Sequence, residues 1–172
     1  MKRALEPRTL NLEPDAGFTL IELLIVMSIM LIIMAFAIPQ ILQLQKKAHQ
    51  ASAQQTMRVI ASAEDSYNQS GAGFACPLSA LGGDPKSGAP TAEAAQLIPP
   101  ELASSGVKAG YIFTVTCGSK TTVNNHDVYN SFEVIGVPQT VGKTGDDGYC
   151  TDENNIIKYD PAGGTNCTQT IQ

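Results

Sequence analysis

The sequence predicts an α+β fold in which a long N-terminal α-helix packs on a small antiparallel β-sheet head. Two observations predict it. An unbroken apolar run from Phe18 to Ile38 continues into a helical pattern, and from Tyr111 onward the apolar residues alternate with period two. The chain has 172 residues, of which 43% are hydrophobic. This is enough for one compact head plus the extra helix, but not for several independent cores.

The apolar run is long enough to be a membrane span. It has about 21 residues, close to the roughly 20 that cross a bilayer as a helix and more than a secretory signal uses. Its single ionisable residue is Glu22. Basic residues before the run favour a cytoplasmic N-terminus, so everything after Pro39 should be exported. These basic residues are Lys2, Arg3 and Arg8.

The chain divides into four expected segments. The first segment is polar, contains Pro7 and Pro14 and shows no helical or strand periodicity, so it is interpreted as a processed or disordered leader rather than a folded element. The segments are the leader 1–17, the apolar transmembrane half-helix 18–39, the amphipathic half-helix 40–70, and the globular head 71–172, with its loop, sheet and disulfide-closed C-terminal region.

The two half-helices are expected to form one continuous helix. Pro39 has no backbone N–H for the carbonyl of Ala35, so the helix should kink or loosen there rather than stop. In the second half one apolar stripe is expected to face the head. Its members are Ile41, Leu44, Ala48, Ala51, Val59, Ala63 and Tyr67. Glycines from Gly71 onward end the helix.

The head is expected to continue with a loop and then a sheet of three or four strands. The loop should contain a short helix over Thr91–Leu97, followed by Pro99-Pro100. Alternating or apolar runs mark the strands, and Asn154-Asn155 marks a hairpin turn. The expected strands are Tyr111–Cys117, about Val128–Val137, Tyr149–Asp152 and Ile156–Tyr159.

Four cysteines lie in the exported part: Cys76, Cys117, Cys150 and Cys167. Their even number and wide spacing favour two disulfides over a zinc site. Three pairings are open. Cys76 with Cys117 and Cys150 with Cys167 is favoured because sequence neighbours close the shorter loops.

Charge and motifs argue against several function classes. With 11 basic and 16 acidic residues the net charge is -5, so nucleic acid is not indicated as a partner beyond a local basic patch. The acidic residues Asp146-Asp147 and Asp152-Glu153 lack EF-hand spacing for calcium. The two histidines, His49 and His126, belong to no recognisable catalytic or metal motif. We therefore expect no catalytic residues, no metal, no cofactor and no enzyme activity.

The segment from Gly17 to Leu24, with the sequence GFTLIELL, resembles the processing motif of type IV prepilins and of the related secretion pseudopilins. The resemblance implies that prepilin peptidase cuts between Gly17 and Phe18 and N-methylates Phe18. Pro39 falls where many pilins carry a helix-loosening proline. The leader departs from the family, because it is longer and more acidic than the short basic leader typical of subunits that start with Phe.

Glu22 is the charged residue of this motif, and it lies within an apolar helix. A carboxylate in an apolar helix costs about 2.5 kcal/mol or more unless a partner neutralises it. Cleavage creates a cation, the free amine of Phe18, in the same subunit or in a neighbour. The resemblance implies that pairing between subunits sets their register during assembly. The alternative is an ordinary membrane anchor in which Glu22 lies at the headgroups.

The resemblance implies the pilin fold and a structural filament subunit, in which the leader 1–17 is cleaved and the half-helix 18–39 forms the filament core. The run from Gly142 to Asp160 is also similar to the heads of environmental bacterial pilins. The implied function is a major pilin of an extracellular type IV pilus, used in adhesion, motility or DNA uptake. The implied partners are other copies of the chain, prepilin peptidase, the assembly platform with its ATPase motor, and the inner membrane before assembly. The alternatives are a type II secretion pseudopilin or a single-span membrane-anchored enzyme or receptor.

Overall fold

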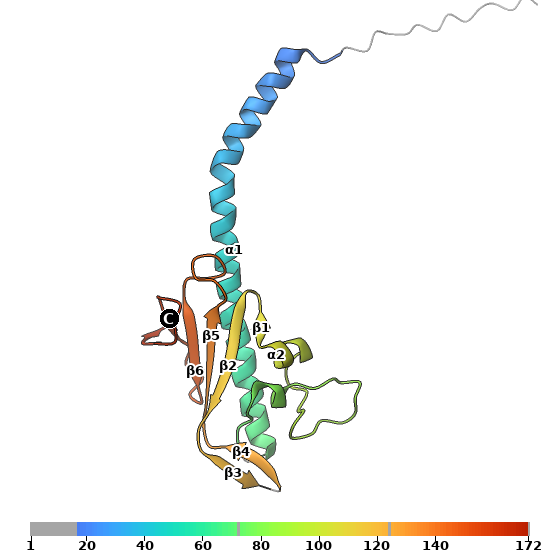
Figure 1. Ribbon diagram of the computed structural model, residues 1–172, viewed down its shortest axis with the longest axis vertical. Helices are drawn as coiled ribbons and strands as arrows, with labels where there is room; N and C mark the ends of the chain where they lie inside the picture. The colour runs from blue at the N-terminus through green and yellow to red at the C-terminus, as the bar shows by residue number, and fades with distance from the viewer. Residues whose placement is uncertain (1–16, 72, 124, 172) are drawn as a thin grey trace, which may run out of the picture. The chain divides into compact units, whose positions relative to one another are not determined.

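The computed structural model describes residues 17–71, 73–123 and 125–171. The expected leader 1–17 therefore lies outside the described residues, apart from Gly17. The chain forms two compact units, Met1–Gln40 and Ile41–Gln172. One helix, α1 (Leu20–Gly71), contributes residues to both units (Figure 1).

The described part of the first unit is the apolar start of α1. By length and composition this helix can cross a membrane. The large apolar side chains from Phe18 to Ile38 are 44% to 82% exposed, so none of them is buried by another of the described residues. Pro39 lies inside α1, and the expectation that the helix continues through this proline is confirmed.

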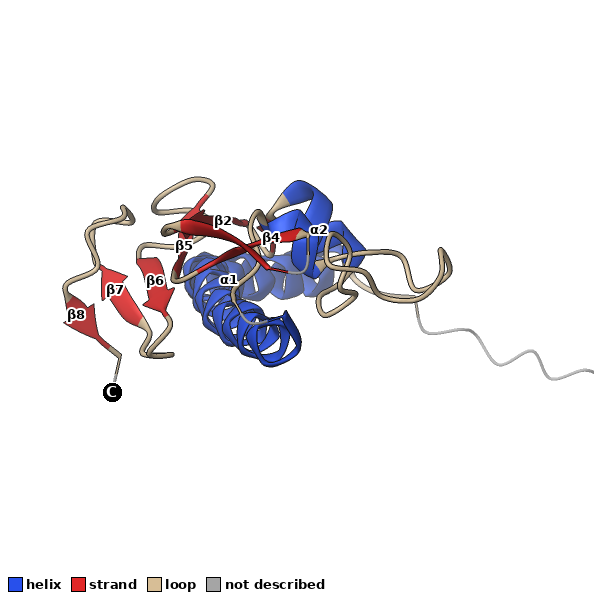
Figure 2. Cartoon of the chain, turned by 90° about the horizontal axis from the view of Figure 1, so that it is seen from below, coloured by secondary structure: helices blue, strands red, loops and turns tan. Residues whose placement is uncertain are grey.

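The second half of α1 supplies one side of the head's core. Its buried face includes Ala53, Met57, Ile60 and Tyr67, and Figure 2 shows this half lying along one face of the sheet. The apolar stripe predicted for this half-helix was wrong at its N-terminal end, where the side chains are exposed rather than buried. The exposed members are Ile41, Leu44, Ala48 and Ala51, whereas Ala63 and Tyr67 are buried as expected.

The sheet is larger than the three or four strands expected. Six strands form one antiparallel sheet in the order β1-β2-β5-β6-β7-β8, and two more, β3 and β4, form a separate hairpin. The expected strand Val128–Val137 is in fact two strands, β4 and β5. The strands are β1 (Val107–Lys108), β2 (Tyr111–Cys117), β3 (Lys120–Val123), β4 (His126–Tyr129), β5 (Phe132–Pro138), β6 (Gly148–Asp152), β7 (Lys158–Asp160) and β8 (Gln169–Thr170).

Side chains along the central strands point alternately into the core and into solvent. In β2 the side chains of Tyr111, Phe113 and Val115 are buried while their neighbours are exposed, which confirms the period-two pattern. Phe113 lies opposite Gly136 of β5. A Cβ on Gly136 would lie 3.0 Å from the Phe113 ring and 3.3 Å from the sulfur of Met57. The missing side chain therefore leaves room for the helix and the ring to pack against the sheet.

The segment between α1 and β1 holds two short helices, neither at the expected place. The first is a 3-10 helix, η1 (Leu78–Leu81), and the second is α2 (Pro100–Ser105), which begins at a proline and ends at Gly106. Gly106 has a φ of 64°, the left-handed conformation that glycine adopts at helix ends. The predicted helix over Thr91–Leu97 is absent because its backbone bonds elsewhere. Ala95 N–H donates to Ala80 O (2.9 Å) and Leu97 N–H donates to Leu81 O (2.8 Å).

Two disulfides close the head. Cys76–Cys117 joins the segment after α1 to the end of β2, across 41 residues of sequence. Cys150–Cys167 joins β6 to the C-terminal segment, across 17 residues. These are the two pairs that the sequence favoured.

Candidate processing and assembly site

The junction between Gly17 and Phe18 lies just before the first turn of α1. Residues 17–19 are not helical and are exposed. The Phe18 side chain is 80% exposed, and a Cβ on Gly17 would meet nothing within 4 Å. Both residues of this peptide bond are thus exposed and outside the helix, and the helical hydrogen bonds begin at Thr19, whose carbonyl accepts the N–H of Leu23 at 3.3 Å.

Thr19 and Glu22 bond reciprocally at the start of α1. The N–H of Glu22 donates to Thr19 Oγ1 at 3.3 Å, and the N–H of Thr19 donates to Glu22 Oε2 at 3.4 Å. The Thr19 hydroxyl also donates to Glu22 Oε2 at 3.4 Å. This is the capping-box arrangement, in which a threonine and a glutamate three residues later satisfy free N–H groups at a helix start. These bonds hold the Glu22 carboxylate beside Thr19, at the first turn of α1.

Thr19 was not singled out from the sequence, although its signal was visible. The pattern Thr19-Leu20-Ile21-Glu22 has the threonine and glutamate spacing of a capping box. A neutralising cation was the only partner predicted for Glu22, so its bond to the preceding hydroxyl was missed.

The free N–H groups at this end of α1 stabilise a carboxylate, but no cation among the described residues pairs with it. Glu22 lies in the first turn, where the free N–H groups of a helix attract negative charge. Within the described residues, Glu22 makes no salt bridge. In the uncut chain the nitrogen of Phe18 is a neutral amide. A cut at Gly17 would convert it to an amine four residues before Glu22.

The described residues contain no cluster of three or more metal-binding side chains. Three of the four acidic residues considered for calcium bond to other groups. Lys46 pairs with Asp146 at 2.8 Å, and Gln50 donates to Asp147 at 3.0 Å. Asp152 accepts from the backbone N–H of Asn154.

Comparison with known proteins finds one match, to a motif in the N-terminal segment. Residues 14–38 match the model of the prokaryotic N-terminal methylation motif. No curated protein and no solved structure matches the chain. The motif and the apolar helix are those of precursors that carry a processing site before a membrane helix. With the helix-on-sheet head, they support a type IV pilin-like prepilin. Pilins and pseudopilins share the motif, so it does not separate them.

Proposed function

We propose that this chain is the precursor of a major pilin, the structural subunit of an extracellular type IV pilus. The role is structural rather than enzymatic. One observation carries the proposal: an exposed, non-helical Gly17–Phe18 junction directly precedes a helix whose apolar side chains, up to Ile38, stay exposed among the described residues. Prepilin peptidase cuts this bond at the inner membrane and methylates Phe18. The mature subunit then serves adhesion, motility or DNA uptake.

Cleavage supplies the charge that Glu22 needs. An unpaired carboxylate in the hydrocarbon costs about 2.5 to 3.5 kcal/mol. The new amine of Phe18 in a neighbouring subunit offsets this cost only at one axial offset between the two helices. The capping bonds from Thr19 hold the carboxylate at the helix start, where that amine can reach it. Charge pairing thus selects the register of assembly.

Burial of the apolar half-helix drives assembly. Its side chains leave lipid by exchanging lipid contacts for contacts with identical helices. Copies joined by a repeated, non-closing contact form a helical filament. The assembly platform and its ATPase motor supply the work that draws each subunit out of the inner membrane. Pro39 lets the helix loosen during this step, because the carbonyl four residues before it has no intrahelical N–H partner.

A pseudopilin of a type II secretion system is the second candidate, because the same motif serves both classes. The chain has no tryptophan and therefore lacks the Asp-Pro-Trp-Gly pattern of a pseudopilin calcium loop. This absence favours the pilin. A single-span enzyme or receptor is the third candidate, and in that case the chain would work uncut.

The test replaces Glu22 with alanine and compares surface fibres and membrane fractions. We expect normal amounts of precursor in the membrane and no fibres. Ser28→Ala is the matched control, since this nearby exposed side chain bonds only to the Leu24 carbonyl of its own helix. Normal fibres from Glu22→Ala would refute the register role. Fibres missing from both variants would mean that any polar change in the helix blocks assembly.

A further inference from the structure

Two apolar features lie at opposite ends of the head. One is an exposed turn, Thr140–Gly145, called the Val141 turn below. The other is a pocket beside the C-terminal end of α1, called the Tyr67 pocket. The Val141 turn lies near Lys46, whereas the pocket reaches Gly71. About 25 residues of helix separate these two points, or roughly 38 Å. Figure 1 shows the two ends, with the β5–β6 loop at one and the β3–β4 hairpin at the other.

The Val141 turn is a rigid projection. Val141 is 56% exposed, the highest value among the large apolar side chains described after Gly71. The turn is held by backbone bonds from Gly142 N–H to Gly145 O (2.8 Å) and from Thr144 N–H to Thr140 O (3.0 Å). Lys46 and Gln50 of α1 fix the two acidic residues that follow it. An apolar side chain is therefore presented to solvent on an ordered support.

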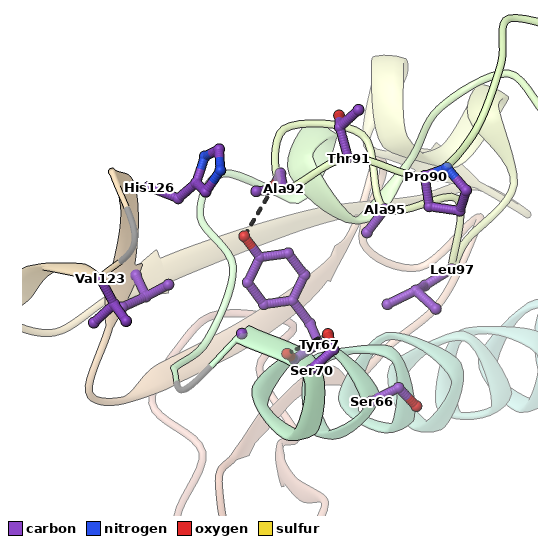
Figure 3. A pocket seen from close by; sticks show the side chains of 12 residues that line it. Ser66, Tyr67, Ser70, Pro90, Thr91, Ala92, Ala95, Leu97, Val123 and His126 are labelled. Atoms are coloured by element: carbon purple, nitrogen blue, oxygen red, sulfur yellow. Dashed lines mark hydrogen bonds between the residues drawn. The ribbon is translucent and has the colours of Figure 1, made fainter.

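The Tyr67 pocket is a preformed cavity of about 500 Å³. It lies between the last turns of α1, the 90–97 segment and the β3–β4 hairpin. Tyr67 forms its centre and donates its hydroxyl to Ala92 O at 2.9 Å, as Figure 3 shows. Apolar side chains line both sides, with Leu97 still 39% exposed. They include Pro90, Ala95, Leu97, Val123 and Val128.

The charges beside the two features are opposite. Lys143 in the Val141 turn is exposed and makes no salt bridge within the described residues. Beside the pocket, Glu93 is 74% exposed and contacts His126 Nδ1 at 3.1 Å. His126 also lines the pocket. The side chains of Lys143 and Glu93 carry opposite charges and attract each other when two copies meet.

We infer that the Val141 turn of one copy docks into the Tyr67 pocket of the next copy along the fibre, with Lys143 beside Glu93. The inference rests on the proposed filament function and names the head contact within it. A projection and a complementary pocket on different surfaces of one molecule produce a head-to-tail contact, which repeats without closing. Because the two features lie at opposite ends of the head, this contact stacks heads along α1.

The test uses the full chain with Val141→Cys and Leu97→Cys together. Fibres are sheared from cells, treated with a mild oxidant and separated without reductant. The oxidant removes two electrons and two protons as the two thiols form one disulfide between neighbouring copies. We expect a ladder of covalent multimers from the double variant and monomers from each single variant. Fibres of the double variant that stay monomeric would overturn the inference while leaving the filament function intact.

Other outcomes further separate the proposed head contact from the proposed filament function. A ladder from either single variant would overturn the assigned pair, because it needs contact between identical sites. Absence of fibres from unmodified cells would overturn the proposed function and this contact together. A charge swap gives a second measurement. Lys143→Glu should lower fibre yield by about tenfold through like-charge contact, and adding Glu93→Lys should restore it. No recovery in the double swap would contradict the proposed charge pairing.

Discussion

Glu64 should make the stability of the head depend on pH. This residue on the inner face of α1 is 0% exposed. Its Oε2 accepts the N–H of Ala75 at 2.8 Å, while Oε1 has no partner. Burial raises the pKa of Glu64 from 4.5 to about 7, opposed by the bond from Ala75 and reinforced by the charge of Asp65. No salt bridge of the described residues reaches this carboxyl.

The direction of the pH effect on the free energy of unfolding follows from the protonation of Glu64 in the folded and the unfolded chain. Below pH 4.5 the carboxyl is protonated in both the folded and unfolded chain, so it carries no ionisation penalty. Between pH 4.5 and 7 the unfolded chain loses the proton while the folded chain keeps it, and the free energy of unfolding falls. Above pH 7 the penalty is constant at about 3 kcal/mol, from about 1.4 kcal/mol per pKa unit.

The variant Glu64→Gln removes this titration and keeps an oxygen for the Ala75 N–H. Urea unfolding of the disulfide-intact head from Ile41 onward measures the difference between variant and parent. We expect similar stability at pH 4 and a variant more stable by up to about 3 kcal/mol at pH 8. Glu101→Gln, at an exposed position, controls for the loss of one negative charge. A Glu64 difference that stays flat from pH 4 to pH 8 would refute this account.

Three further changes test the fold and the helix start. Removing the Cys150–Cys167 disulfide, which closes a loop of sequence separation 17, should cost about 3 kcal/mol in urea unfolding. Gly145→Ala should destabilise the head by about 1 to 3 kcal/mol, because its Cβ would overlap the Tyr111 hydroxyl. Thr19→Val removes the capping oxygen. It should cost about 1 kcal/mol at the helix start, measured as roughly fivefold faster amide exchange there in detergent micelles.

Each of these changes has a control and a contradicting result. Thr19→Ser keeps the hydroxyl and should leave amide exchange nearly unchanged, so equal acceleration in both variants would argue against capping. Gly71→Ala places its Cβ 3.5 Å from the Tyr67 ring, an ordinary contact. If it destabilised the head as much as Gly145→Ala, the overlap would not be the cause. Unchanged urea midpoints without the disulfide would contradict the loop-closure estimate.

The sequence predicted the elements whose pattern is set by their own neighbours. Strand β2 was predictable because Tyr111, Phe113 and Val115 alternate with exposed residues, and the sheet buries that face. The hairpin of β3 and β4 was missed because Lys120–Val123 is polar, with three of four positions exposed. Strands β1 and β8 have two residues each, too few to show a period.

The sequence-based predictions were wrong where tertiary contacts determine the secondary structure or the burial of a residue. The composition of Thr91–Leu97 suits a helix, yet its backbone bonds to η1 instead. Ile41 and Leu44 are as apolar as a core stripe, but no part of the head covers them. The burial of Glu64 was equally hidden, since it depends on the segment around Ala75 folding back onto α1. Apolarity can be read from a sequence, whereas the neighbour that buries a residue cannot.

The N-terminus of the protein in sheared surface fibres tests the central claim most directly. Mass spectrometry of abundant fibres should find a chain that begins at N-methylated Phe18, without the leader that ends at Gly17. A chain that keeps Met1 and remains in the membrane, with no fibres on the cell surface, would contradict the account.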